Sequence, residues 1–423
     1  MGGKLIVPPI VQAQNVIYEN AVVVQPSDDL QTKYDWLKSA DRDAAMGALS
    51  ATNRRTLILA PGTHTITSAI DFDTDYVDVS SISGNPTDTI LTGVLVPHNI
   101  TQTCDVMSMS NFKMDSTYNS TTNNWNFIIN SASGSNSGSV YTNLIVWHQN
   151  PFRFGTSRFP VLNSCDEAGL WINCRSTTYG WRPAKDQDFS PTMWNCVSGD
   201  SSFGGDQQND TTGTGIIGGT FYNCVGGDDS FGGCAAFGMD CSSDSRFYNC
   251  VAGNNSYAMG KEFAGQAFNC IGGSDSFAGY GTGTDYGVMS GLLVGCICSA
   301  DSVGSGHTSC SNTGTMRNCN VTAMDSPIML GSGAVIEHCR IEQVSTGIDA
   351  IAITDDTVVP RIFNSTIKVL AAGTGVPVNA GAAQNAYVAH CRMNNRDNDA
   401  DGLGANVTNL CSNGSFNVVE NDI

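Results

Sequence analysis

Two aspartates at equivalent places in a repeated segment are the residues best suited to acid–base chemistry. Asp200 and Asp228 each follow a cysteine by four residues. If neighbouring repeats stack as β-strands, equivalent residues lie about 4.8 Å apart, near the roughly 5 to 5.5 Å between the carboxyl groups of a retaining glycosidase. The pair is therefore a catalytic candidate. The alternative is a polar ladder of turn residues, because the position continues as Asn254 and Ser274.

Other acidic side chains offer further candidates. Asp206 and Asp229 are close enough in sequence to exchange roles with the first pair, or to bind Ca²⁺ through oxygen ligands. Asp71, Asp73 and Asp75 alternate with apolar residues, which places three carboxylates about 7 Å apart on one side of a strand. A solvated strand face explains this second group better than a site does.

A candidate binding surface lies in the segment TTYGWRPAKDQDFSPTMW. The candidate aromatic and charged residues in it are Tyr179, Trp181, Arg182, Lys185, Asp186, Asp188 and Trp194. Aromatic faces beside charged hydrogen-bonding groups are suited to sugar recognition, and loops on a rigid scaffold commonly carry function. Both tryptophans are equally compatible with the core, since Trp181 belongs to the aromatic repeat described next and Trp194 to the strand before a cysteine.

Cysteines reveal the elements that position these residues. Eleven segments align on one position, with spacings of 20 to 28 residues. The aligned residues are Cys174, Cys196, Cys224, Cys250, Cys270, Cys296, Cys319, Cys339, Ser365, Cys391 and Cys411. A second repeat, seven residues later, comprises Trp181, Phe203, Phe231, Tyr257, Phe277 and Val303. Gly, Asp, Asn and Ser fill the interval, which is typical of turns.

This repeat predicts an all-β fold, a right-handed parallel β-helix. Variable spacing and a high glycine content disfavour helical repeats, whereas short strands tolerate insertions at their turns. The cysteines and the aromatic residues are then expected to form two internal columns. The Asn or His residue before each cysteine is expected to point outward or to cap a turn.

Composition limits the function classes. The formal charge of −19 and the pI near 4.4 argue against a nucleic-acid partner. No apolar run reaches the length of a membrane-spanning helix, so we expect no membrane insertion. The N-terminal residues do not resemble a signal peptide, which favours synthesis in a reducing cytoplasm with free thiols. The chain contains no Cys-x-x-Cys pair, so we expect no zinc site.

The N-terminal region predicts a cap. Residues 28–50 form the best helix candidate, because Leu30, Tyr34 and Leu37 share one face. The following RRTLILAPGTHTITSAIDFDTDYVDVSSIS predicts two strands around a Pro-Gly turn and then a third strand. Residues 25–80 resemble the entry coil of the pectate-lyase-like superfamily, and in particular its bacteriophage tailspikes, where a helix and a "PGTYTI"-like hairpin precede the β-helix. His64 stands at the usual aromatic place.

The resemblance implies a homotrimeric virion tail protein that binds a host-cell surface glycan. It implies an N-terminal attachment segment at 1–27 that contacts other tail proteins, a capping region at 28–55, a parallel β-helix at 56–394 and a closing segment at 395–423. It implies no cofactor beyond the candidate Ca²⁺. Lyases of the superfamily use calcium-binding aspartates with a basic residue, and this chain shows no matching set, so hydrolysis is favoured over lyase chemistry.

Three functions therefore remain open. The first is a virion tailspike or tail fibre that binds, and in one version depolymerises, a surface polysaccharide. The second is a non-enzymatic structural, capsid-decoration or adhesive β-helix. The third is a secreted polysaccharide lyase or hydrolase, which the N-terminus and the sixteen cysteines disfavour.

Overall fold

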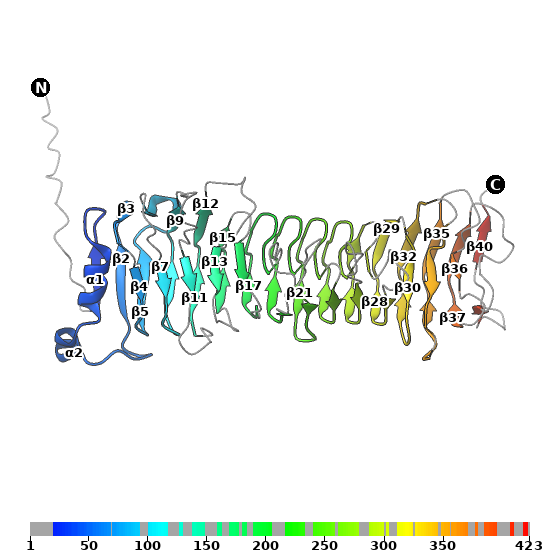
Figure 1. The fold of residues 1–423 in the computed structure, drawn as a ribbon, viewed down its shortest axis with the longest axis horizontal. Coiled ribbons are helices and arrows are strands. Elements are labelled where there is room, and N and C mark those ends of the chain that lie inside the picture. The colour runs from blue at the N-terminus through cyan, green and yellow to red at the C-terminus, as the bar shows by residue number, and fades with distance from the viewer. Residues whose placement is uncertain are drawn as a thin grey trace, which may run out of the picture.

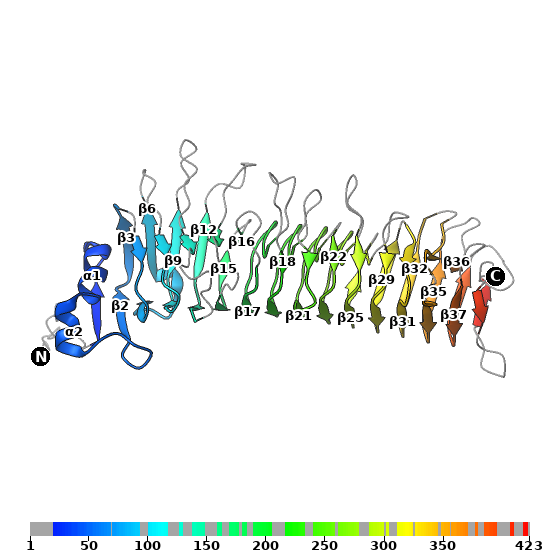
Figure 2. The ribbon, with the colours of Figure 1, turned by 60° about the horizontal axis from the view of Figure 1, so that its bottom comes forward.

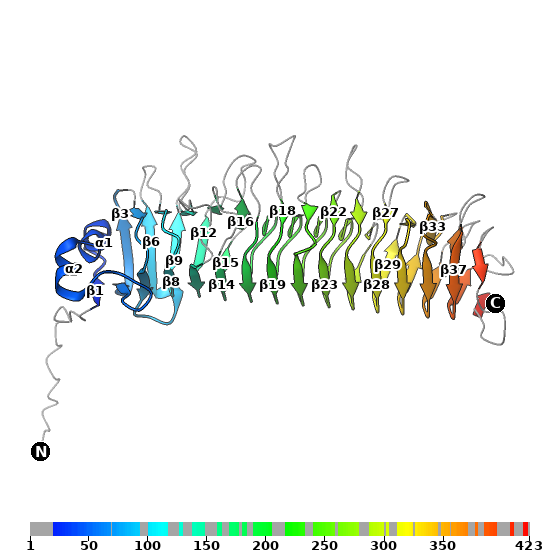
Figure 3. The ribbon, with the colours of Figure 1, turned by 90° about the horizontal axis from the view of Figure 1, so that it is seen from below.

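A parallel β-helix forms the body of the protein (Figure 1). The computed structural model describes residues 20–68, 70–93, 100–116, 127–129, 138–148, 159–162, 169–176, 180–183, 189–204, 216–232, 240–258, 261–278, 287–299, 302–303, 311–324, 326–345, 348–355, 357–370, 377–379, 385–395, 407–409 and 418–421. Successive coils follow one straight axis, and the two helices lie at its N-terminal end, as Figure 2 and Figure 3 also show. The predicted fold class is confirmed.

Each coil passes through three faces in a fixed order, and successive strands of one face pair in parallel. Face 1 is one continuous sheet of sixteen strands. Its strands are β1 (Ala21–Val24), β2 (Arg55–Leu59), β5 (Val77–Ser81), β8 (Ser108–Ser110), β11 (Val140–Thr142), β14 (Leu170–Ile172), β17 (Thr192–Trp194), β19 (Thr220–Tyr222), β21 (Arg246–Tyr248), β23 (Gln266–Phe268), β25 (Leu292–Val294), β28 (Thr315–Arg317), β31 (Val335–Glu337), β34 (Arg361–Phe363), β37 (Ala386–Ala389) and β39 (Val407–Asn409).

Face 2 has two sheet segments, which single parallel bridges at Val197, Val225, Val251 and Ile271 connect. Its strands are β3 (Gly62–Ile66), β6 (Thr89–Gly93), β9 (Lys113–Ser116), β12 (Ile145–His148), β15 (Arg175–Ser176), β26 (Ile297–Cys298), β29 (Asn320–Met324), β32 (Arg340–Gln343), β35 (Thr366–Val369), β38 (Arg392–Asn395) and β40 (Val418–Asn421). A 3₁₀ turn, η1 (Pro86–Asp88), precedes β6.

Face 3 also has two segments. Its strands are β4 (Ile70–Phe72), β7 (Ile100–Gln102), β10 (Phe127–Ile129), β13 (Phe159–Leu162), β16 (Gly180–Pro183), β18 (Ile216–Ile217), β20 (Asp240–Cys241), β22 (Glu262–Phe263), β24 (Val288–Met289), β27 (Ser311–Asn312), β30 (Ile328–Leu330), β33 (Ile351–Ile353) and β36 (Val378–Asn379).

Asparagine makes the corner between face 1 and face 2. Asn195, Asn223, Asn249 and Asn269 have φ values of 52° to 53°, a left-handed conformation that asparagine tolerates better than most residues. Each side chain points outward, and its Nδ2 donates to Oδ1 of the equivalent asparagine one coil earlier, at 3.0 to 3.3 Å. The expectation that these residues face away from the core and shape a turn is confirmed.

The left-handed corner residue also shifts the alternation of side chains by one position. Met193 before Asn195 and Cys196 after it are both fully buried, although they are three positions apart. Trp194, which follows Met193, and Val197, which follows Cys196, are 40% and 39% exposed. A regular strand would place Trp194 and Cys196 on the same side, and the corner places them on opposite sides.

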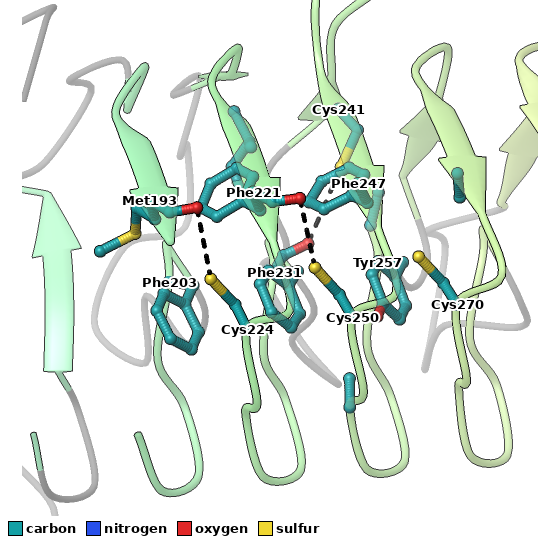
Figure 4. Packing of buried hydrophobic residues seen from close by; sticks show 14 of the residues in the cluster. Met193, Phe203, Phe221, Cys224, Phe231, Cys241, Phe247, Cys250, Tyr257 and Cys270 are labelled. Carbon is teal, nitrogen blue, oxygen red and sulfur yellow. Dashed lines mark hydrogen bonds between the residues drawn. The ribbon is translucent and has the colours of Figure 1, made fainter. Parts of the chain in front are cut away.

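The predicted cysteine column is confirmed among the described residues. All twelve described cysteines are buried and free. Seven thiols of the column donate to a carbonyl of the preceding coil, as in Cys250, whose Sγ donates to the Phe221 oxygen at 3.5 Å (Figure 4). Burial raises the pKa of the Cys250 thiol, and the neighbouring thiols of Cys224 and Cys270 raise it further. Among the described cysteines, the column is a stack of buried thiols without disulfide bonds.

The predicted aromatic column is confirmed as well. The rings of Trp181, Phe203, Phe231, Tyr257 and Phe277 stack nearly parallel, with centroids 4.4 to 5.1 Å apart. Phe221 and Phe247 form a second column that meets the first edge-on, at interplanar angles of 81° to 87° (Figure 4). Stacked and edge-on pairs each contribute about 0.5 to 1.5 kcal/mol beyond their burial, so these columns stabilise the interfaces between the coils from Trp181 to Phe277.

The N-terminal cap differs in detail from its prediction. The expected single helix at 28–50 is two helices, α1 (Leu30–Leu37) and α2 (Ala40–Met46), because the chain turns at Ser39, which has an extended backbone. Helix α1 buries its predicted face, and the Tyr34 ring packs edge-on against Phe72 at 5.1 Å. Its N-cap is Asp29, whose side chain accepts a hydrogen bond from the Thr32 amide at 2.7 Å. The first coil is thus covered.

The two strands predicted around the Pro-Gly turn are confirmed as β2 and β3. They do not form the hairpin that the resemblance implies, because β2 pairs with β1 and β5 whereas β3 pairs with β6. The carboxylates of Asp71, Asp73 and Asp75 do not share one strand face, because β4 ends at Phe72. Asp73 instead holds Lys38 of the cap at 2.8 Å, and Asp75 accepts hydrogen bonds from the following coil. His64 is buried and bonds the Ala60 carbonyl.

The β-helix extends beyond the predicted boundaries at both ends. Strand β1 lies within the segment 1–27, and β39 and β40 lie within 395–423, yet all three pair with neighbouring coils. The predicted capping region, 28–55, contains both helices and ends at Arg55, the first residue of β2. No helix in the described part of the chain is long and apolar enough to span a membrane.

The inward column makes a direct prediction. Cys250→Asp places an unpaired charge in an apolar interior, which costs on the order of several kcal/mol, so we expect the variant to lose soluble folded protein. Cys250→Ser is the matched control, because Ser365 occupies the same column and is buried. Soluble yield and thermal unfolding followed by circular dichroism measure both. A Cys250→Asp protein that melts like the wild type would show that this side chain is not internal.

Candidate functional site

The structure brings Asp200 and Asp228 together as neighbours in a ladder at the turn after face 2. The backbone N–H of Asp228 donates to Asp200 Oδ1 at 3.0 Å, and the N–H of Asn254 donates to Asp228 Oδ1 at 2.7 Å. The N–H of Ser274 continues the series with Asn254 Oδ1 at 2.9 Å. One oxygen of each carboxylate is therefore engaged in binding the backbone of the next coil.

Glycine makes this ladder sterically feasible. A Cβ at Gly227 would collide with Asp200 Oδ1, and a Cβ at Gly253 would collide with Asp228 Oδ1. Both aspartates are exposed, so their second oxygens remain available to solvent. The geometry thus gives the pair a structural role, and its catalytic role stays a prediction.

The remaining predicted residues divide into four groups. Trp181 is fully buried in the aromatic column, which corrects the expectation of a surface role. Asp229 is half-buried with a φ of 56°, and its N–H donates to the Asn254 carbonyl at 2.8 Å. Arg182 lies in β16, where the backbone alone is described. The other candidates lie outside the described residues, namely Tyr179, Lys185, Asp186, Asp188 and Asp206.

An outward aromatic ladder on face 1 is the most distinctive surface feature of the described residues. Trp194 stacks on Tyr222 with centroids 3.8 Å apart, and Tyr222 stacks on Tyr248 at 4.8 Å. Phe268 completes the ladder at 5.1 Å from Tyr248. The series occupies one position in the four consecutive strands β17, β19, β21 and β23. Mutual stacking covers the ring faces inside the ladder and leaves the ring edges along its length outside the stack, while Ile172 and Val294 are paired in register with the terminal residues Trp194 and Phe268.

Hydrogen-bonding side chains run along both sides of this aromatic ladder. Two positions earlier in the same strands, about 7 Å away, lie Thr192, Thr220, Arg246 and Gln266. On the other side lies the asparagine ladder, in which each Nδ2 uses one hydrogen for its neighbour. An amide nitrogen carries two hydrogens, so the second is available to a ligand.

The surface is nearly uncharged. Among the outward residues of face 1 from β14 to β25, Arg246 is the only charged one, in a chain with a formal charge of −19. Its guanidinium bonds the Ser243 and Asp244 carbonyls at 3.3 and 3.1 Å. The surface therefore suits an uncharged, hydroxyl-rich ligand.

The sequence did not predict this aromatic ladder, because side chains were assumed to alternate strictly between inside and outside from the strand through the cysteine. Trp194 and Cys196 share a side under this assumption, which allowed Trp194 to belong to the core. The available signal was the repeated aromatic-Asn-Cys triplet, together with the tendency of asparagine to adopt the left-handed conformation.

No family model matches this chain, and no curated protein sequence matches it. Among solved structures, it is similar to the catalytic domain of GH87 alpha-1,3-glucanase in complex with nigerose, with 13% identity, a TM-score of 0.40 and coverage of 98% of this chain and 70% of that chain. It is also similar to the A-module of the Azotobacter vinelandii mannuronan C-5 epimerase AlgE6, with 13% identity, a TM-score of 0.32 and coverage of 90% and 94%. At these values, the activities of those proteins do not transfer to this chain.

Substitution of Asp228 tests the turn ladder. Asp228→Asn keeps an acceptor like that of Asn254 in the next coil, so we expect wild-type stability. Asp228→Ala leaves the Asn254 amide without its acceptor, which costs about 1 to 2 kcal/mol, and we expect a lower urea midpoint. Equal midpoints for the two variants would show that the bond does not stabilise the coil.

Proposed function

We propose that this protein is an elongated attachment protein that binds a surface polysaccharide along face 1. The observation that carries the proposal is the outward ladder of Trp194, Tyr222, Tyr248 and Phe268 between two rows of hydrogen-bonding side chains. A sugar has apolar C–H faces, which pack against aromatic rings, and hydroxyl groups, which bond amide and hydroxyl side chains. This surface supplies both kinds of side chain next to each other.

The rigid scaffold supports a repeating ligand. Four rungs at about 4.8 Å extend the aromatic ladder over roughly 14 Å, which suits several consecutive units of a polymer. Binding groups fixed by sheet hydrogen bonds lose little conformational entropy when a ligand binds. The low charge of the surface favours a neutral polysaccharide over a strongly anionic one.

The setting that we propose is the tail of a virion. The resemblance of residues 25–80 to the entry coil of bacteriophage tailspikes supports it. In this setting, the residues before β1 attach the rod to other tail proteins, and the exposed flank contacts a glycan of the host cell. The chain is made in the host cytoplasm, which agrees with a core of buried, unpaired thiols among the described residues.

Glycan hydrolysis is a second candidate function, and one observation favours it. Asp200 and Asp228 lie on adjacent rungs, each with an exposed carboxylate. The engagement of one oxygen of each carboxylate with the backbone weighs against a catalytic pair, since a nucleophile and an acid need free oxygens aimed at the substrate. We therefore propose binding as the main function.

Binding to a panel of extracted bacterial surface polysaccharides tests the main proposal. We expect at least one polysaccharide to bind, and we expect Trp194→Ala and Tyr222→Ala to weaken that binding at least tenfold, equivalent to about 1.4 kcal/mol. Phe363→Ala is the matched control, because Phe363 occupies the same strand position on β34, outside the aromatic ladder. Equal losses for all three variants, or no binding across a broad panel, would contradict the proposal.

Product analysis of the same mixtures separates attachment from depolymerisation. Reducing ends report hydrolysis, and absorbance of unsaturated sugars reports lyase activity. Cleavage that either Asp200→Asn or Asp228→Asn abolishes, without loss of stability, would make the protein a depolymerase and place its site on the turn ladder. Binding without cleavage is the outcome that we expect.

A further inference from the structure

A second outward ladder, on face 2, consists of exposed β-branched residues. It comprises Val197, Val225, Val251, Ile271 and Ile297, which are 37% to 45% exposed. Successive members pair through parallel bridges. The five residues therefore form one aliphatic ridge about 19 Å long, given rungs about 4.8 Å apart. Single exposed aliphatic residues are ordinary on protein surfaces, whereas a contiguous row of this kind marks an interaction site.

The residues directly beside the aliphatic ridge are small or uncharged, and the nearest acidic side chains, Asp200 and Asp228, follow Val197 and Val225 by three residues. On one side, two residues after each of the first four members, lie Gly199, Gly227, Gly253 and Gly273, which have no side chains to rise beside the ridge. On the other side lies the asparagine corner. Polar residues continue the same row at both ends, with Arg175 before Val197 and Asn320 after Ile297. An apolar centre with a polar rim is the usual anatomy of a protein–protein interface.

The repeat distance identifies the partner. The side chains of the ridge recur at the spacing of paired strands, and a surface can follow all five rungs only if its own side chains recur at that spacing. A second copy of this chain carries the same ridge and the same glycine strip with the same spacing. Matching repeats of this kind let side chains interlock over a whole length, as in steric zippers.

Charge supports the same partner. Two copies with a formal charge of −19 each repel one another. The electrostatic repulsion is smallest when the surfaces that face each other are uncharged. The ridge offers five consecutive rungs without a charged side chain. We infer that the aliphatic ridge of face 2 is the seam along which copies of this chain associate side by side. This inference does not depend on glycan binding, which uses face 1.

The oligomeric state of the full-length chain tests the inference. We expect sedimentation and light scattering to show an oligomer for the wild type, and a monomer for the double variant Val225→Asp with Ile271→Asp, whose charges lie two rungs apart. Val358→Asp is the matched control, because Val358 is an exposed aliphatic residue, at 56%, in a turn away from the ridge. It should remain oligomeric. Circular dichroism verifies that each variant is folded.

A monomeric wild type at tens of micromolar would overturn the inference, and so would a folded double variant that stays oligomeric. If the double variant fails to fold, a cross-linking variant decides. Val251 is the middle rung, so it meets its own counterpart whether the copies run parallel or are related by a two-fold axis through the centre of the ridge. Val251→Cys should yield disulfide-linked dimers on a non-reducing gel under native conditions, whereas the wild type should not. Absence of dimers from a folded Val251→Cys protein would overturn the seam.

Discussion

Parallel pairing between successive coils is the constraint on which the rest of this structure depends. A strand that pairs in register with the equivalent strand of the next coil places each side chain about 4.8 Å from its equivalent. Every position of the repeat therefore becomes a ladder, and the residue at each rung must pack well against its equivalents in the neighbouring coils. The stability of such a fold is approximately a sum of interfaces between neighbouring coils.

The observed ladders follow from this rule. Thiols are small and neutral, and flat rings stack on rings with little loss of contact. Asparagine carries a donor and an acceptor on one side chain, so Asn195 accepts a hydrogen bond from Asn223 and donates one to Asn173. Carboxylates repel their equivalents, and the turn ladder accordingly changes from Asp228 to Asn254 and then Ser274, while each acceptor binds a backbone N–H.

The same rule arranges the exterior side chains in long rows parallel to the axis of the solenoid. A globular domain places binding groups from many directions around a pocket, whereas a solenoid repeats one group along a line. Here the lines are an aromatic ladder on face 1 and an aliphatic ridge on face 2, with the asparagine corner between them. Two adjacent stripes of different chemistry allow one flank of the rod to bind a polymeric ligand while the neighbouring flank binds another copy.

The sequence alone determined the β-helix, the inward thiols and the internal aromatic column, because all three follow from periodicity. The helical cap also followed from its apolar pattern, although not the break at Ser39. Tertiary structure decided which residues face outward. Asn195 in the left-handed conformation reverses the alternation, so Trp194 joins an exterior ladder while Trp181 joins the core. Backbone dihedral angles at single residues set these directions, and pairing between neighbouring coils stabilises them. The spacing of residues along the chain therefore does not reveal which side chains face outward.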